Sequence, residues 1–277
     1  MNFRHPLVAI ALFILLQIVG VSLFYIFGRS IWYPYYEKIN AKPIMCPKAK
    51  ECPKCQECPP CPKCTKKHLD VNLSAWKVTT YIPPKSKLSI EKRVNRHLGN
   101  SGFVVYPKKL TIIGMKHERQ LEVWGELHGK WVFIATYPFT AFSGQLGPKI
   151  EEGDRQIPEG FYKITHLNPH SKFHLSMKLN YPNELDKKAA KKEKRTGLGG
   201  DIMIHGNNRT IGCVPIGDEG IEELYRLVKK VGMSNTKVIL APVDFRKITV
   251  NIKKDKHPWL NKLYKDLTKE MKHFTSK

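Results

Sequence analysis

A histidine and a cysteine that could form a nucleophilic pair lie eight residues apart in the last third of the chain. His205 ends the apolar segment 201–205 and precedes Gly206, whereas Cys213 follows Gly212. A cysteine attacks as its thiolate, which a nearby imidazole can generate by removing the thiol proton. Backbone amides beside a glycine can stabilise a developing oxyanion. The alternative is a buried structural cysteine beside a core histidine, and the spacing alone does not exclude it.

The distribution of the other cysteines singles out Cys213. Six of the seven lie between Cys46 and Cys64, where they could pair among themselves, and this leaves Cys213 as the odd thiol. Such a leftover thiol in an exported protein is a candidate reactive group. The six repeat in a proline-rich stretch that cannot form a continuous helix. Disulfides within or between chains, a bound metal and a plain stalk all stay open for this segment, and a disulfide-linked homo-oligomer is one form of the first.

Several segments around the pair resemble the YkuD-type L,D-transpeptidases, which are peptidoglycan enzymes with a cysteine nucleophile. The motifs 204–206 and 211–213 resemble the catalytic signature of that family. Three further segments resemble upstream parts of the same domain, in the expected order: 146–149, 153–162 and 181–183. The resemblance covers about residues 121–240. It implies a mainly β fold with peripheral helices (α+β), built as a YkuD-like β-sandwich.

The resemblance also implies roles for the paired residues. Cys213 would attack the acyl carbonyl between an L-centre and the terminal D-Ala of a tetrapeptide stem. His205 would be its base, the Gly206 carbonyl would orient the imidazole, and the Gly212 and Cys213 amides would form the oxyanion hole. The acyl group would then pass to the amine of a neighbouring stem, to another amine or to water. The family implies no cofactor and no metal.

The motif departs from the most common family pattern. The gap between His-Gly and Gly-Cys is short, Ile211 stands where most members have a second histidine, and Val214 follows the cysteine. This pattern is similar to a shorter-motif branch in which hydrolysis of peptidoglycan-linked amides is also known. A transpeptidase, a carboxypeptidase or amidase that uses water, and a non-catalytic tether that binds the wall are therefore the functions to distinguish.

The chain is strongly basic. It has 277 residues with 47 Lys and Arg against 24 Asp and Glu, a formal charge of +23. Such a charge indicates an anionic partner or a basic surface that serves solubility. We exclude nucleic acid, because no usual nucleic-acid-binding module is visible. The candidate substrate-binding residues are basic side chains on both sides of 196–204: Arg209, Lys187, Lys188, Lys191 and Lys192. For the four lysines the alternative is a solvated helix or loop.

Two other polar groups carry weaker signals. His166, His170 and His174 recur every four residues, but the Asn-Pro pair at 168–169 breaks a helix there, so we expect no metal site. Asp154 and Glu159 form an acid pair by type. We expect them to serve the scaffold more than to position a substrate.

The hydrophobic pattern predicts the elements that must hold the pair. Alternating or β-branched runs predict these strands: 110–113, 120–124, 130–136, 160–165, 172–179, 201–205 and 237–240. A short helix is expected at 90–98 and a turn at 99–102. A second helix, 219–231, is expected to be capped by Asp218 and closed by Gly232. From Pro258 onward the spacing predicts an amphipathic helix that packs on its own domain or, alternatively, lies on a membrane surface; its apolar positions are Trp259, Leu260, Leu263, Leu267 and Met271.

The N-terminal region has the composition of a membrane anchor. Residues 6–27 are uncharged and almost entirely apolar, and as a helix they would reach about 33 Å. An uncleaved anchor is favoured over a signal peptide, because the run is long and no typical cleavage site follows. We expect a single pass in a bacterial cytoplasmic membrane with the N-terminus inside and the catalytic domain in the periplasm or otherwise outside. The expected organisation is 1–30 anchor, 31–69 linker, 70–102 connecting segment, 103–250 catalytic domain and 251–277 basic C-terminal helix.

Overall fold

A computed structural model describes residues 67–70, 85–251 and 257–275. The expected anchor and the cysteine-rich segment lie outside these residues. Within the described ranges, no helix is both long enough and apolar enough to cross a bilayer.

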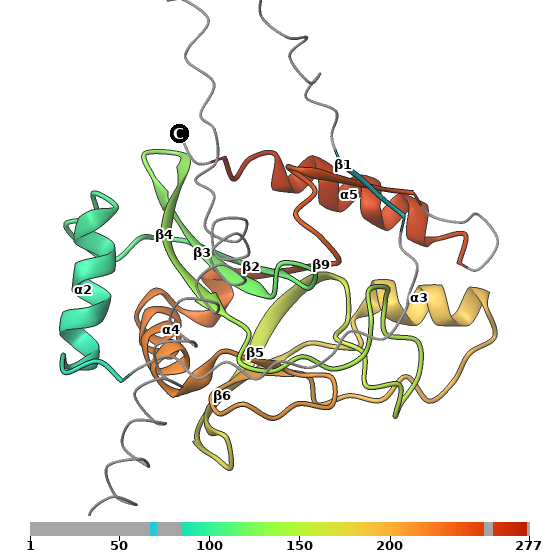
Figure 1. Cartoon of the computed structure of the whole chain (residues 1–277), viewed down its shortest axis with the longest axis horizontal. Helices are drawn as coiled ribbons and strands as arrows, with labels where there is room; N and C mark the ends of the chain where they lie inside the picture. Colours follow the sequence, from blue (N-terminus) through green and yellow to red (C-terminus); the bar gives the residue numbers. More distant parts are fainter. Residues whose placement is uncertain (1–66, 71–84, 252–256, 276–277) are drawn as a thin grey trace, which may run out of the picture. The chain divides into compact units, whose positions relative to one another are not determined.

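Eight strands form one continuous mixed sheet in the order β4-β3-β2-β9-β5-β6-β7-β8 (Figure 1). The strands are β2 (Leu110–Met115), β3 (Gln120–Leu127), β4 (Lys130–Pro138), β5 (Gly160–Ser171), β6 (His174–Leu179), β7 (Met203–His205), β8 (Val214–Pro215) and β9 (Thr236–Ala241). β2 runs parallel to β9 and β7 parallel to β8, whereas the other neighbours are antiparallel. A separate parallel pair joins β1 (Lys67–Asp70) to β10 (Ile248–Asn251).

The α+β content is confirmed, but the described strands do not form a sandwich of two separate sheets. Residues 160–163 of β5 pair with β9, and the later part of the same strand pairs with β6. β5 therefore belongs to both halves, and the sheet continues through it. All seven predicted strands are present, with two shifts. Lys172 and Phe173 form the turn of the β5–β6 hairpin and are not part of a strand, and β7 begins at Met203, two residues later than predicted.

In the described part of the chain, four α-helices lie around the sheet, and a short 3-10 helix, η1 (Met233–Asn235), precedes β9. They are α2 (Ile90–Asn100), α3 (Glu184–Lys192), α4 (Gly217–Val231) and α5 (Leu260–Met271). The prediction for 90–98 is confirmed, and Ser89 caps this helix through a bond from the Lys92 amide. Gly232, at φ 98°, ends α4 as predicted.

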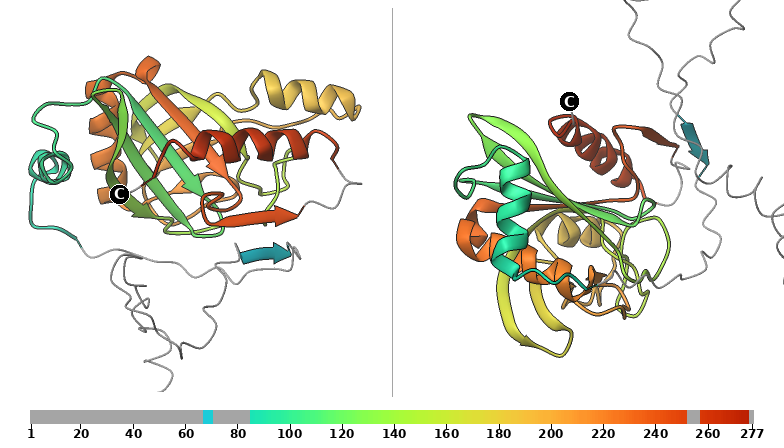
Figure 2. Two further views of the ribbon diagram at one scale, coloured as in Figure 1. Left: turned by 90° about the horizontal axis from the view of Figure 1, so that it is seen from above. Right: turned by 60° about the vertical axis from the view of Figure 1, so that its left-hand side comes forward.

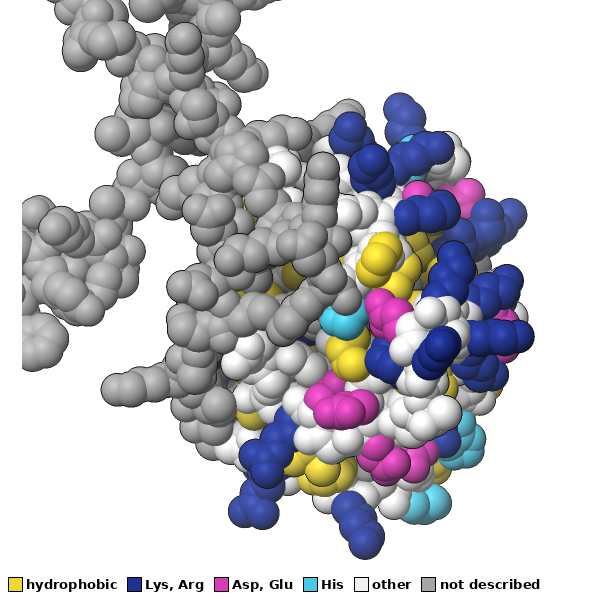
Figure 3. Space-filling view, turned by 90° about the vertical axis from the view of Figure 1, so that its right-hand side faces the viewer, with side chains coloured by type: hydrophobic (Ala, Val, Ile, Leu, Met, Phe, Trp, Pro, Cys, Tyr) yellow, Lys and Arg dark blue, Asp and Glu magenta, His cyan; other side chains and the backbone are white. Residues whose placement is uncertain are grey.

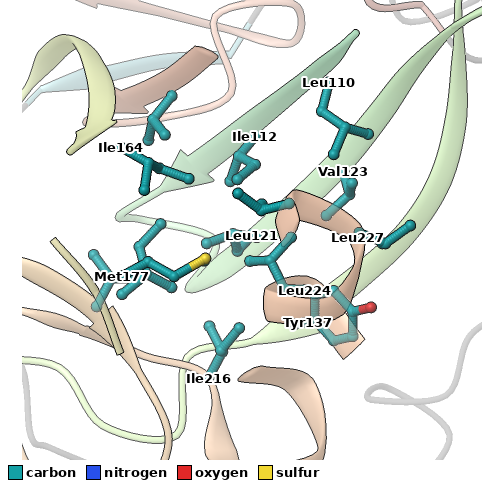
Figure 4. Packing of buried hydrophobic residues seen from close by; sticks show 14 of the residues in the cluster. Leu110, Ile112, Leu121, Val123, Tyr137, Ile164, Met177, Ile216, Leu224 and Leu227 are labelled. Atoms are coloured by element: carbon teal, nitrogen blue, oxygen red, sulfur yellow. The ribbon is translucent and has the colours of Figure 1, made fainter. Parts of the chain in front are cut away.

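The central strands are buried on both faces, because their side chains alternate between two cores. Leu110 and Ile112 of β2 join one core together with residues of α2 and α4. Figure 4 shows both side chains in this core with Leu224 and Leu227. Ile113 and Met115 of the same strand join the other core, which contains residues of α5. The helices thus cover both faces of this part of the sheet (Figure 2).

The amphipathic C-terminal helix packs on its own domain. Leu260, Leu267 and Met271 are buried in the second core, and Tyr264 and Phe274 are buried with them. The Trp259 side chain lies against this core and donates to Glu193, which directly follows α3. The apolar face of α5 is therefore occupied by the protein itself.

A fully buried ion pair joins this helix to the sheet and to the loop at 144–159. The Nζ atom of Lys116 lies 3.0 Å from Oε1 of Glu159 and donates to the carbonyl oxygens of Gly147 (2.6 Å) and Ile157 (2.9 Å). The Tyr264 hydroxyl donates to the other carboxylate oxygen of Glu159. Burial lowers the pKa of Lys116, although Glu159 opposes this shift. Because water cannot reach either group, each charge is stabilised by the other.

Replacement of Lys116 by Met should lower the free energy of unfolding by about 3–5 kcal/mol, because it leaves the Glu159 carboxylate buried and unpaired. The measurement is a urea unfolding curve followed by tryptophan fluorescence. Lys262→Met is the matched control: Lys262 pairs with Asp266 at 3.0 Å on the surface, and its loss should cost less than about 1 kcal/mol. Equal effects of the two variants would show that the buried pair does not hold the loop and helix together.

Candidate active site

Strand pairing brings His205 and Cys213 to the same face of the sheet. β7 and β8 are parallel, with Ile204 opposite Val214 and His205 opposite Pro215. Ile204 and Val214 are fully buried in the core, so the alternating side chains of His205 and Cys213 point to the other face. Continuing this register one step places Cys213 beside Met203. Standard strand spacings then put the Cα atoms of the two candidates roughly 8 Å apart, within reach of their side chains.

The imidazole of His205 is buried and fixed in one tautomer. His205 is 2% exposed, and its Nδ1 is hydrogen-bonded to the Gly206 carbonyl. A carbonyl oxygen can only accept, so Nδ1 must carry the proton and Nε2 of the neutral ring has the free lone pair. Burial lowers the pKa of His205, and the Gly206 bond opposes this only in part. His205 is thus held as a neutral imidazole whose Nε2 could accept a proton.

The Cys213 thiol is also held in its neutral form. Its Sγ donates to the Asp201 carbonyl at 3.5 Å. Burial raises the pKa of Cys213, and the Asp201 carboxylate adds to this, whereas the Met203 backbone and Lys149 act in the opposite direction. With both groups neutral, the thiol would have to give up its proton to a base as its sulfur attacked any acyl group.

Gly206 is squeezed between two elements. A Cβ atom at this position would lie 2.7 Å from Oδ1 of Asp218 and 2.8 Å from the carbonyl oxygen of Phe173. Both distances are shorter than van der Waals contact, so only glycine fits here. The residue whose carbonyl orients the imidazole is thereby fixed between the β5–β6 turn and the first turn of α4.

The predicted helix cap by Asp218 is wrong. α4 begins at Gly217 after Ile216, and no side chain caps it. The Asp218 carboxylate instead accepts from the Asn207 amide at 2.7 Å, while the Thr140 hydroxyl donates to the Asn207 carbonyl at 2.6 Å. Asp218 lies inside the first turn of α4 and not before it. Its carboxylate therefore bonds the loop that follows His205 and not the start of its own helix.

The loop just before Cys213 is organised by Thr210. The Gly212 amide donates to Oγ1 of Thr210 at 3.1 Å, and the same hydroxyl donates to the Cys213 carbonyl at 2.7 Å. Gly212 has φ 132°, and a Cβ there would lie 3.1 Å from the Gln156 carbonyl oxygen. The amide expected in the oxyanion hole is therefore bound to Thr210 in this structure, and an oxyanion would have to take the place of that hydroxyl.

The comparisons with known proteins agree with this geometry. Residues 116–243 match the family model of the YkuD L,D-transpeptidase catalytic domain. This part of the chain is therefore similar to the catalytic domain of the YkuD family. The chain is 30% identical over 162 residues to the protein named "Putative L,D-transpeptidase YafK" of Escherichia coli (strain K12), an alignment that covers 57% of this chain and 61% of YafK. The chain thus matches about three fifths of the length of this curated relative.

Two solved structures show weaker likeness. The helical cell shape determining protein Pgp2 from Campylobacter jejuni is 23% identical over 58% of each chain, with a TM-score of 0.42. Bd1075 from Bdellovibrio bacteriovorus is 21% identical over 59% of this chain and 56% of its own, with a TM-score of 0.36. At this similarity, neither structure bears on what the YkuD domain described here does.

The two predicted acids of this YkuD domain lie in different networks. The Asp154 carboxylate accepts from Nζ of Lys149 at 2.6 Å and from the Ile150, Glu151 and Gln156 amides. Burial alone would raise the pKa of Asp154, but these bonds lower it overall. Glu159 belongs to the buried pair with Lys116. Both residues shape the loop beside Gly212, which is the scaffold role that the sequence favoured.

The candidate basic residues are all exposed, on two different segments. Arg209 lies in the loop between β7 and β8. Four exposed lysines lie on α3: Lys187, Lys188, Lys191 and Lys192. Many lysine and arginine side chains gather on the side of the molecule where α3 lies (Figure 3). Among the described contacts, none joins these lysines to the Cys213 loop.

The three spaced histidines are on strands. His166 and His170 are exposed on β5, and His174 on β6 bonds to Glu222 of α4. Across the described residues, no three His, Cys, Asp or Glu side chains are grouped as they would be around a metal ion.

Sequence reasoning missed Phe173 and Thr210 and misassigned Asp218. Phe173 is 32 positions before His205 in the chain, and it meets the site only because the β5–β6 hairpin folds back beside β7. No periodicity marks a single aromatic residue in a turn. Thr210, three residues before Cys213, could have been suspected, because a threonine hydroxyl can bond nearby backbone groups in a loop.

Proposed function

We propose that the chain is a peptidoglycan L,D-transpeptidase that acts on tetrapeptide stems through a thioester on Cys213. The observation that supports this most directly is the β7–β8 register, which brings His205 and Cys213 to one face in a domain of the YkuD family. The strongly basic composition suits a substrate whose stem peptides end in carboxylates.

The proposed chemistry has two steps. In the first, the Cys213 proton moves to Nε2 of His205 as Sγ attacks the acyl carbonyl and forms the C–S bond. The C–N bond to the terminal D-Ala then breaks, and the proton on His205 passes to the leaving amine. In the second step, an amine gives its proton to His205 and attacks the thioester, so that a new amide bond forms and the thiol is restored. Water in place of that amine yields a free carboxylate.

The group that accepts the acyl chain from Cys213 distinguishes the proposed transpeptidase from a hydrolase. A carboxypeptidase or amidase would use the same Cys213 thioester with water. Ile211, which stands where most members of the family have a second histidine, is exposed, and its side chain offers no hydrogen bond to an amine or to water. A wall-binding tether without catalysis would need neither His205 nor Cys213.

Incubation of the full chain with isolated peptidoglycan, followed by muropeptide analysis, tests this function. We expect new cross-links between stems or exchange of the terminal D-amino acid, and a loss of at least about a thousandfold in Cys213→Ala, because an alanine side chain cannot form the thioester. Trimmed stems or released amide partners without new bonds would identify the hydrolase instead. Unchanged muropeptides with a folded, reduced chain would leave only the tether.

We further propose that the exposed lysines of α3, together with Arg209, bind the carboxylates of the stem peptides. Reversal of the charge at Lys187, Lys188, Lys191 and Lys192 should weaken binding to isolated cell wall by about tenfold or more at low salt and make the remainder less dependent on salt.

The control for this variant reverses four exposed lysines elsewhere, at the same change in net charge: Lys108, Lys130, Lys229 and Lys230. Sedimentation of the protein with wall sacculi over a range of salt concentrations measures both variants. Equal loss of binding in the two would show that net charge matters and that α3 has no special part.

A further inference from the structure

The tip of the β5–β6 hairpin covers His205. Phe173 lies in the two-residue turn between these strands, and its ring centroid is 4.7 Å from that of His205, with 33° between the ring planes. Distances of this kind are typical of favourable aromatic pairs. Phe173 is nevertheless 38% exposed, so it adds little to the apolar core. Among the described residues, its aromatic partner is the imidazole of His205.

Hydrogen bonds and close contacts from three segments hold the tip of the hairpin in place. The Phe173 amide donates to Oγ of Ser171 at 3.1 Å. The next residue, His174, is 2.8 Å from the Glu222 carboxylate of α4 through its Nε2. The Phe173 carbonyl lies against Gly206, and the Gly206 amide donates to the Leu175 carbonyl at 3.2 Å. The phenyl ring is therefore set in place by the hairpin, by α4 and by the motif that carries His205.

The surroundings of His205 show the extent of this cover. Ser176 is the register partner of His205 on β6, and it is fully buried. Its neighbours on the same face, His174 and Lys178, are more than two fifths exposed at their side chains. The face is thus open to water along the strand but closed where His205 and Ser176 lie, and this is where the Phe173 ring packs.

We propose that Phe173 is a positioning residue that holds the imidazole of His205 in its working orientation and shields one face of it from water. The proposal rests on the proposed function for its effect on turnover, but the state of His205 can be measured without turnover. The Gly206 carbonyl fixes the imidazole at one atom, Nδ1, which still allows the ring to tilt. A ring stacked against its face removes that freedom.

Removal of the aromatic ring should let water reach His205. Because burial lowers the pKa of His205, loss of this cover should raise it. The charged or titratable groups around His205 are Cys213 on the β8 side, Asp218 and the His174–Glu222 pair at α4, and the Lys178–Asp201 pair at β6. Substitution of one uncharged residue by another changes none of them, so a shift would report the cover itself.

The test is a histidine side-chain NMR titration of the full chain, in which the His205 signal is the one lost in His205→Gln. In Phe173→Leu we expect His205 to titrate at a higher pH than in the native chain, and in Phe173→Tyr, which keeps the ring, to titrate as in the native chain. Phe133→Leu is the matched control, since Phe133 is 37% exposed and packs edge-on against Trp124 at 5.5 Å. It should leave His205 unchanged.

Turnover of a tetrapeptide stem gives the second readout. Phe173→Leu should lower kcat by about tenfold while KM stays within about twofold, because a misplaced base slows the chemical step and leaves binding intact. Phe173→Tyr should restore most of the rate. Ser171→Ala removes the hydroxyl that accepts from the Phe173 amide, keeps the ring and changes no charge. It should shift the titration in the same direction by less, and it replaces Phe173→Leu if that variant does not fold.

The outcomes separate this inference from the proposed function. An unchanged His205 titration in Phe173→Leu would overturn the positioning role. A raised KM with unchanged kcat and titration would make Phe173 a substrate contact and would also overturn it. The expected titration shift in a chain that turns over no stem peptide would support the positioning of His205 and count against the proposed function alone.

Discussion

The site depends on the parallel pairing of two very short strands. β7 has three residues and β8 only two, so their ladder alone could hold little. The pairing is stabilised because Ile204 and Val214 are fully buried in the core, and because the Ile216 amide, one residue beyond β8, donates to the His205 carbonyl at 2.9 Å. A slip of one residue in this register would turn Cys213 into the core and separate it from His205.

The groups around this pairing act on the same short segment from different sides. Asp218 and Thr140 hold Asn207, Thr210 holds the residues before Cys213, and the loop organised by Asp154 lies against Gly212. Each support comes from a different element of the fold. The result is a buried imidazole and a half-buried thiol, both neutral, in a fixed relation. This state suits a nucleophile that is deprotonated only when a substrate is present, and a neutral thiol is less prone to unwanted oxidation than a thiolate.

The sequence predicts the elements well where a local pattern specifies them. Alternation in 120–136, the apolar periodicity of 260–271 and the glycine at 232 each follow from rules that act within a few residues, and the structure confirms these elements. The His205 and Cys213 motifs were found for the same reason. What escaped prediction depends on distant contacts: the continuity of the sheet through β5, the partner of Asp218, the separate networks of Asp154 and Glu159, and the approach of Phe173. No local pattern encodes these contacts, because each depends on how the β5–β6 hairpin and the first turn of α4 are placed in three dimensions.

The central claim is that Cys213 carries the acyl group, and peptide-level mass spectrometry tests it most directly. The full chain would be mixed with a tetrapeptide stem substrate, quenched in acid to preserve thioesters and digested, beside Cys213→Ser and His205→Gln. The account predicts an acyl adduct on the peptide that contains Cys213 in the native chain, with a mass that corresponds to the stem without its terminal D-Ala, and a much slower appearance in His205→Gln. Turnover of the stem with no adduct at Cys213, or an adduct on one of the cysteines between 46 and 64, would contradict it.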